Sequence, residues 1–124
     1  MNLKSKIFAV LGLCLCAALF VTVYSQTSQP KETLYKDIKP VLDKNCISCH
    51  NANRAQDGLR LDNYESIMKG SKHGKVVIPK DDKKSLLMQY IRGEKKPRMP
   101  FGKSPLSKTD EDIIAKWIKD GAKK

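Results

Sequence analysis

The stretch Cys46-Ile47-Ser48-Cys49-His50 decides how the rest of this 124-residue sequence is interpreted. It places two thiols on either side of two residues and an imidazole directly after the second thiol. That spacing sets the sulfurs apart by about the reach of the two vinyl groups of one haem, and His50 can then lie under the iron. The pattern predicts one covalent haem c, attached at Cys46 and Cys49, with His50 as the proximal iron ligand.

Three other kinds of site could use the same residues. A zinc ion takes four ligands, and the chain beyond residue 25 offers Cys46, Cys49, His50 and His73. Zinc is disfavoured because His50 directly follows Cys49, which hinders joint coordination, and because the sequence contains no second C-x-x-C pair. A thioredoxin-like dithiol would need a βαβ pattern, which the sequence does not have. A structural disulfide beside a chance histidine is the third alternative.

Residues 1–25 have the pattern of a targeting segment. Lys4 and Lys6 give a positive start, residues 7–23 are uncharged and apolar, and Ser25 offers a small residue for cleavage. We expect a cleaved signal peptide, and an uncleaved N-terminal anchor is the alternative because the apolar run is only slightly short for a span. The expected location is periplasmic or otherwise extracytoplasmic, in soluble or membrane-anchored form.

The sequence is basic, with a formal net charge of +11, or +9 once residues 1–25 are removed. The lysines are spread along the chain and form no single block, so solubility alone would account for many of them. We do not expect a nucleic-acid partner for an exported protein. We expect redox partner proteins with an acidic docking surface, or a position near an anionic membrane.

From Thr33 onward the pattern of apolar residues is mainly helical. Residues 26–32 are polar and form a linker, and one domain is expected over residues 33–124. A first helix is expected from Thr33 up to the cysteines, because apolar residues recur there at three- and four-residue steps. Pro40 lies inside this run and is expected to kink or restart the helix.

Three further helices are expected downstream, each with a polar cap before it and a glycine after it. The pairs of cap and stop are Asp62 and Gly70, Asp81 or Asp82 and Gly93, and Ser107 and Gly121. No stretch predicts a strand, and residues 76–78 are expected to be extended because Pro79 follows. The pattern predicts an all-α domain.

The sixth iron ligand is expected to be a methionine. Met68 and Met88 fall in expected helices among apolar residues, where methionine usually fills the core. Met99 lies between Arg98 and Pro100 in a stretch that cannot be helical, and Pro100 favours an extended conformation at Met99. We predict Met99 as the distal ligand. Its alternative role is that of an apolar loop anchor, and His73 is the rival ligand.

These motifs resemble a small class I cytochrome c, closest to the cytochrome c domains typified in planctomycete proteins. The resemblance covers roughly residues 35–122 and implies an all-α, cytochrome c-like domain wrapped around one haem. It also implies His50 and Met99 as axial ligands, and a first helix packed across the last near Trp117. The segments that carry it are residues 38–42, 46–50, 58–62, 85–87, 98–100, 106–107 and 117–122.

A haem with both His and Met ligands has no open position, so it exchanges single electrons and does not readily bind oxygen or peroxide. The expected function is therefore that of an exported monohaem electron carrier, not an enzyme. Two alternatives remain at this point. One is a haem subunit of a periplasmic oxidoreductase complex, and the other is a haem sensor or peroxidase-like protein with a labile sixth ligand.

Export gives the first testable prediction. Fractionation of cells should place the protein outside the cytoplasm, because the charged start and the apolar run of residues 7–23 direct secretion. An N-terminus at Gln26 would identify a cleaved signal peptide, and an intact Met1 in the membrane fraction would identify an anchor. A haem-containing protein in the cytoplasm would contradict both.

Overall fold

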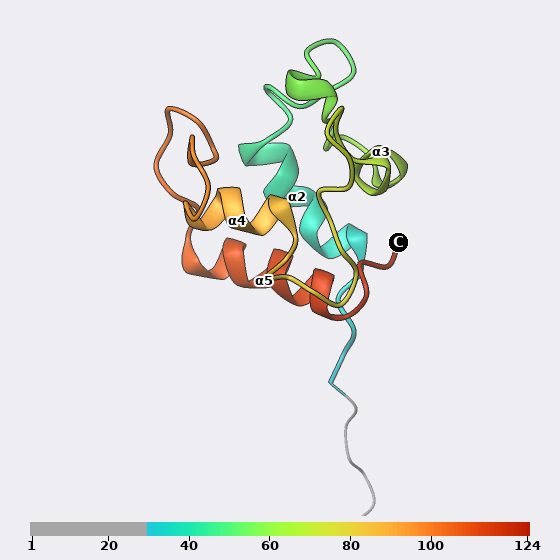
Figure 1. The fold of residues 1–124 in the computed structure, drawn as a ribbon. Helices are drawn as coiled ribbons and strands as arrows, with labels where there is room; N and C mark the ends of the chain where they lie inside the picture. Colours follow the sequence, from blue (N-terminus) through green and yellow to red (C-terminus); the bar gives the residue numbers. More distant parts are fainter. Residues whose placement is uncertain (1–29) are drawn as a thin grey trace, which may run out of the picture. The chain divides into compact units, whose positions relative to one another are not determined.

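The computed structural model describes residues 30–124 of the chain. The predicted targeting segment of residues 1–25 and most of the 26–32 linker lie outside the described residues. The described part contains four α-helices and the 3-10 helix η1 (Gln56–Gly58) (Figure 1). The helices are α2 (Tyr35–Asn45), α3 (Tyr64–Lys69), α4 (Leu86–Arg92) and α5 (Lys108–Lys119). Between residues 30 and 124 no strand forms, and the one isolated β-bridge joins Ser71 and Gly74, so the all-α fold class is confirmed. No helix in these residues is long and apolar enough to span a membrane.

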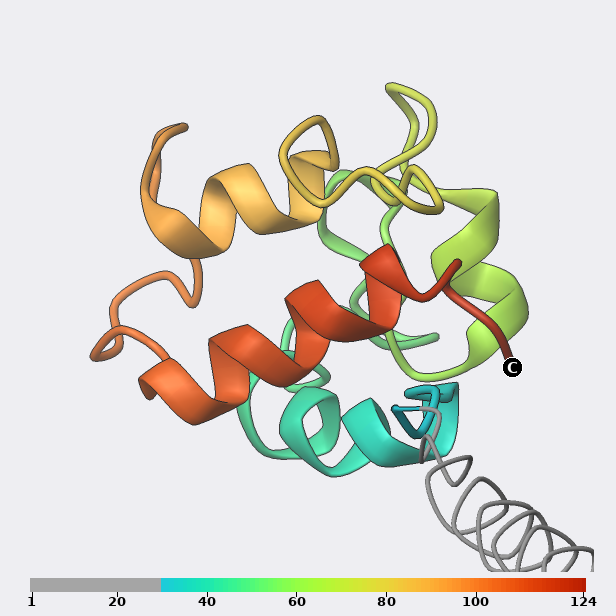
Figure 2. The same cartoon turned by 90° about the horizontal axis from the view of Figure 1, so that it is seen from below.

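Helix α5 lies between α2 and α4, and it packs against both (Figure 2). Its stripe of Ile114, Trp117 and Ile118 is completely buried, because these residues recur at the three- and four-residue steps of one helix face. Ile38 and Leu42 of α2 are also completely buried. The burial of so many large apolar side chains on one helix makes α5 the centre of the core.

The two ends of the domain meet beside Trp117. The carbonyl oxygen of Lys123 accepts a hydrogen bond from the Tyr35 backbone N–H at 2.9 Å and from the Trp117 indole N–H at 2.8 Å. A buried indole N–H needs such a partner. One carbonyl thus joins the start of α2 to α5 and the C-terminal segment. The implied packing of the first helix across the last, near Trp117, is confirmed.

Pro40 does not end and restart the first helix, which was one of the two effects expected of it. α2 runs from Tyr35 to Asn45 with Pro40 inside it. Pro40 cannot donate to the Lys36 carbonyl, but both residues are exposed, so water can replace that bond. Meanwhile Ile38 and Leu42 stay buried on the opposite face, and their burial keeps the helix together across the proline.

The cap of α3 is one residue later than expected. The side chain of Asn63, not Asp62, accepts the Ser66 backbone N–H at 2.8 Å. The Asp62 carboxylate instead pairs with the Arg60 guanidinium at 2.7 Å, two residues back along the chain. Both Asp62 and Asn63 are residues that favour the N-cap position. The ion pair with Arg60 engages the Asp62 carboxylate, so Asn63 is the residue that caps the helix.

Helix α4 begins later than expected, at Leu86. Asp81 does accept a backbone N–H as an N-cap would, from Lys84 at 3.0 Å, but the turn it closes ends at Ser85. Ser85 has an extended backbone (φ −67°, ψ 116°) and is completely buried. Its hydroxyl accepts from Ile78 N–H at 2.8 Å and donates to the Asp81 carbonyl at 2.7 Å. These bonds hold residues 78–85 as a loop, so the helix starts after them.

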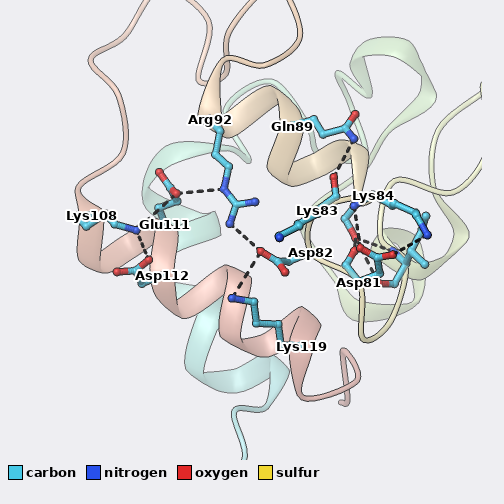
Figure 3. A network of polar contacts seen from close by, with 12 residues as sticks. Asp81, Asp82, Lys83, Lys84, Gln89, Arg92, Lys108, Glu111, Asp112 and Lys119 are labelled. Atoms are coloured by element: carbon cyan, nitrogen blue, oxygen red, sulfur yellow. Dashed lines mark hydrogen bonds and ion pairs between the residues drawn. The ribbon is translucent and has the colours of Figure 1, made fainter.

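An ion-pair network fastens α4 to α5 (Figure 3). The Arg92 guanidinium at the end of α4 donates to the Asp82 carboxylate at 2.7 Å and to Glu111 of α5 at 3.2 Å. Lys119 Nζ lies 3.8 Å from the same Asp82 carboxylate. Only 6% of Asp82 is exposed, so its charge depends on these partners.

The network lowers the pKa of Asp82. Burial by itself raises the pKa of this carboxyl, but the hydrogen bond from Arg92 and the positive charges of Lys119 and Arg92 outweigh burial and hold it below its usual range. A carboxyl whose pKa is lower in the folded state stabilises the fold above the unfolded pKa of about 4. That contribution is lost as the pH falls through the lower, folded pKa.

We expect Arg92→Gln to lower the free energy of unfolding by about 2 kcal/mol at pH 7, because it leaves the buried Asp82 charge without its main partner. Urea unfolding of the haem-loaded protein measures this. The difference from the parent should shrink as the pH is lowered from the unfolded pKa of about 4 through the lower, folded pKa of Asp82, because Asp82 then becomes protonated. The control Lys108→Gln removes an exposed partner of Glu111 and Asp112 and should cost less than about 1 kcal/mol. Equal costs for the two variants, or a pH-independent cost for Arg92→Gln, would contradict the role given to Asp82.

Candidate haem site

The Cys-x-x-Cys-His segment forms a tight turn at the C-terminus of α2. Cys46 is the C-cap of the helix, and its N–H donates to the Leu42 carbonyl at 2.8 Å. The Cys46 carbonyl in turn accepts the N–H groups of Cys49 at 3.2 Å and His50 at 3.1 Å. The helix end therefore dictates where both thiols and the imidazole lie. Both thiols are free, and both are half-buried.

His50 is held in one orientation by a backbone carbonyl. Its Nδ1 lies 3.2 Å from the Leu59 carbonyl oxygen, and the Leu61 N–H donates to the His50 carbonyl at 2.8 Å. A carbonyl oxygen can only accept, so Nδ1 carries the proton and the lone pair is on Nε2. Metal-binding histidines commonly make such a hydrogen bond through the ring nitrogen that does not bind the metal. The bond orients the ring and leaves Nε2 available to a metal.

Both cysteines and His50 line one cavity of about 620 Å³. That volume lies within the range of about 300–1,000 Å³ that is common for small-molecule and cofactor sites. The apolar wall is provided by residues before and on α4, by the segment after the cysteines and by the loop before α5. Its members are Leu59, Leu61, Val76, Leu86, Leu87, Ile91 and Leu106.

Met99 lines the same cavity, from the loop between α4 and α5. This loop is drawn in orange beside α4 in Figure 1, and it is not helical at Met99, as expected. Met88 is completely buried in the core and Met68 packs against the core, as their expected helical positions indicated. His73 also lines the cavity, but it is exposed, and its Nε2 lies 4.0 Å from the Asp57 carboxylate. The cavity thus gathers all four predicted haem-site residues together with the rival ligand.

Burial controls the protonation of one attachment residue. It raises the pKa of the Cys46 thiol to about 11, although the positive charge of Lys103 opposes this effect. Cys46 is therefore a neutral thiol at physiological pH. Both thiols are free, as covalent attachment to a haem requires.

The zinc arrangement is not found in the described part of the chain. Among residues 30–124 no three His, Cys, Asp or Glu side chains gather in a group that could hold a metal ion. His73, which a four-ligand site would have required, lies beside Asp57 and Lys72 on an exposed loop. The geometry of the donor set thus differs from that of a closed zinc site.

Sequence reasoning missed the residues that hold the ligands in place. The Leu59 carbonyl belongs to a residue nine positions from His50. The type of side chain does not indicate which backbone carbonyl will accept a hydrogen bond. Tyr90 lines the cavity, and its carbonyl accepts the Met99 N–H at 3.0 Å. The Tyr90 side chain is half-buried, and nothing in the sequence indicated the role of its carbonyl. The exposed Phe101, at the cavity wall, gave no sequence signal.

The residues present fit a covalently held haem. An apolar wall suits a porphyrin, two free thiols suit its vinyl groups, and an imidazole with an available Nε2 suits the iron. Met99 adds a soft sulfur donor to the same cavity. Cys46 and Cys49 would hold the group, and His50 and Met99 would ligate its iron.

Comparison with known proteins agrees with this fit. Residues 46–100 match the family model described as Planctomycete cytochrome C. The matched segment starts at the first haem-attachment cysteine and ends directly after Met99. No curated protein and no solved structure matches the chain. The match supports a planctomycete-type cytochrome c domain, and that family implies covalently bound haem c.

Proposed function

We propose that this protein is an exported monohaem electron carrier in which His50 and Met99 are the axial ligands of the haem iron. The observation that supports it is the gathering of Cys46, Cys49, His50 and Met99 on the wall of one cavity. The family match supports a haem-based carrier in place of a catalyst. The basic, apolar start of the sequence supports export.

Each side chain has a distinct part in this function. When bound, haem supplies a one-electron Fe(III)/Fe(II) couple. Cys46 and Cys49 fix it by thioether bonds, and the Leu59 carbonyl keeps the lone pair of His50 on Nε2. The Met99 sulfur favours Fe(II) and so raises the reduction potential, while the apolar wall excludes water. A sixth position occupied by Met99 leaves no site for oxygen or peroxide.

The proposed partner is a redox protein with an acidic docking surface. The exposed cations Arg54 and Lys103 line the cavity and are placed to attract such a surface. The net charge of +11 acts in the same direction at longer range. A carrier that docks in this way should show electron-transfer rates that fall as salt screens the attraction.

Covalent attachment is the next prediction. The purified protein should stay red after acid–acetone extraction, and its mass should exceed that of the processed chain by one haem, because thioether bonds survive this treatment. The double variant Cys46→Ala/Cys49→Ala should lose the colour on extraction. Complete extraction of colour from the parent protein, or a mass equal to the bare chain, would sink the proposal.

The distal ligand is tested by Met99→Ala. This variant should keep covalent haem, because Cys46, Cys49 and His50 are unchanged. It should lose the weak near-infrared sulfur-to-iron band of the oxidised protein, and its potential should fall, since the donor that favours Fe(II) has been removed. The reduced variant should bind carbon monoxide readily. Absorbance spectra and a redox titration measure all of these changes.

Met88→Leu is the matched control, because this core substitution conserves volume and should cost less than about 1.5 kcal/mol. It should keep the band and the potential. Retention of the band and the potential in Met99→Ala would show that Met99 is not the distal ligand. Absence of the band from the parent protein, with a changed potential in His73→Ala, would identify His73 as the ligand instead, because an imidazole supplies no sulfur. Rapid carbon monoxide binding by the parent protein would favour a sensor or peroxidase-like protein over a carrier.

A further inference from the structure

The last turn of α4 is capped by the loop that bears Met99. A helix ends with carbonyl groups that have no partner within the helix. Here the Gln89 carbonyl accepts the Lys95 N–H at 3.2 Å, and the Tyr90 carbonyl accepts the Met99 N–H at 3.0 Å. These bonds turn the loop back onto the helix end, so the backbone of Met99 is tied to α4.

Arg98 adds the one side-chain donor of this cap. Its Nε–H donates to the Ile91 carbonyl at 3.3 Å. A positive charge at a helix C-terminus also interacts favourably with the helix dipole. Arg98 and Met99 therefore bind two successive carbonyls of the same helix, Arg98 through its side chain and Met99 through its backbone.

Gly93 makes room for this contact. It is the C-cap of α4, with φ +76°, in the left-handed region that favours glycine. A Cβ at this position would lie 3.2 Å from Cδ of Arg98, which is closer than ordinary contact. The Arg98 side chain thus lies directly against the backbone of Gly93. A side chain at Gly93 would require the Arg98 side chain to shift by a few tenths of an ångström.

The support of the cap is itself fixed. One residue beyond Ile91, Arg92 ties the end of α4 to Asp82 and to Glu111 of α5 (Figure 3). Displacement of the helix end would break that buried network. The Ile91 carbonyl is therefore held in place, and the side chain that binds it is that of Arg98, the residue directly before Met99.

We propose that Arg98 is a positioning residue for the distal ligand, which holds the Met99 sulfur toward the iron by capping α4 at Ile91. The inference rests on the proposed ligation by Met99. Without the cap, the loop retains the backbone bond of Met99 but loses the bond one residue away. The Met99 sulfur then leaves the iron more often, which opens the sixth position.

The test compares Arg98→Leu and Arg98→Lys in the haem-loaded protein. Carbon monoxide should bind reduced Arg98→Leu about tenfold faster than the parent, the effect of losing one hydrogen bond to a charged donor on an exposed loop. The sulfur-to-iron band should weaken and the potential should fall. Arg98→Lys keeps a positive donor on a flexible side chain, one atom farther along than Nε, and should restore most of each property.

Lys96→Gln is the control, because Lys96 is an exposed cation of the same loop that does not line the cavity. It should match the parent in all three measurements. If the parent has the sulfur-to-iron band and Arg98→Leu leaves the band, the potential and the carbon monoxide rate unchanged, Arg98 does not position Met99 and the proposed function stands. If the parent lacks the band and binds carbon monoxide rapidly, the proposed ligation fails, and the inference fails with it.

Discussion

The buried stripe of Ile114, Trp117 and Ile118 on α5 is the packing on which both walls of the cavity depend. α2 packs against this helix and leads directly into the turn that carries Cys46 and His50. α4 packs against it as well and leads into the loop of Met99. Helices α2 and α4 do not have an extensive contact with each other. The spacing between Cys46 and His50 on one side and Met99 on the other is therefore determined by α5, which contributes no residue to the cavity wall.

The C-termini of two helices position the residues of the candidate haem site. At the end of α2, the free carbonyl of Cys46 accepts the N–H groups of Cys49 and His50, and so shapes the attachment turn. At the end of α4, the carbonyls accept from the loop that carries Met99. In both places, groups that a helix leaves without partners are satisfied by the residues next to the ligands. The need to satisfy these backbone groups thus also positions the residues of the candidate haem site.

Local sequence was a good guide where neighbouring residues determine the outcome. Ser107 caps α5 by accepting the Asp110 N–H at 3.1 Å, and Gly93 ends α4, both as expected. It was a poorer guide where a distant partner competes. Asp62 was expected to cap α3 but pairs with Arg60. Pro40 was expected to kink or restart the first helix, but the helix continues through it while the opposite face stays buried.

The sequence by itself predicted the chemical character of the candidate haem site, because the spacing of Cys46, Cys49 and His50 is that expected for attachment of a haem. It also singled out Met99, since the flanking prolines exclude a helix there. Only the tertiary structure decided which groups hold these ligands: the Leu59 carbonyl at His50, and the end of α4 at Met99. The reason is that every residue carries the same backbone N–H and carbonyl, so sequence patterns cannot distinguish the few that become partners when distant segments pack together.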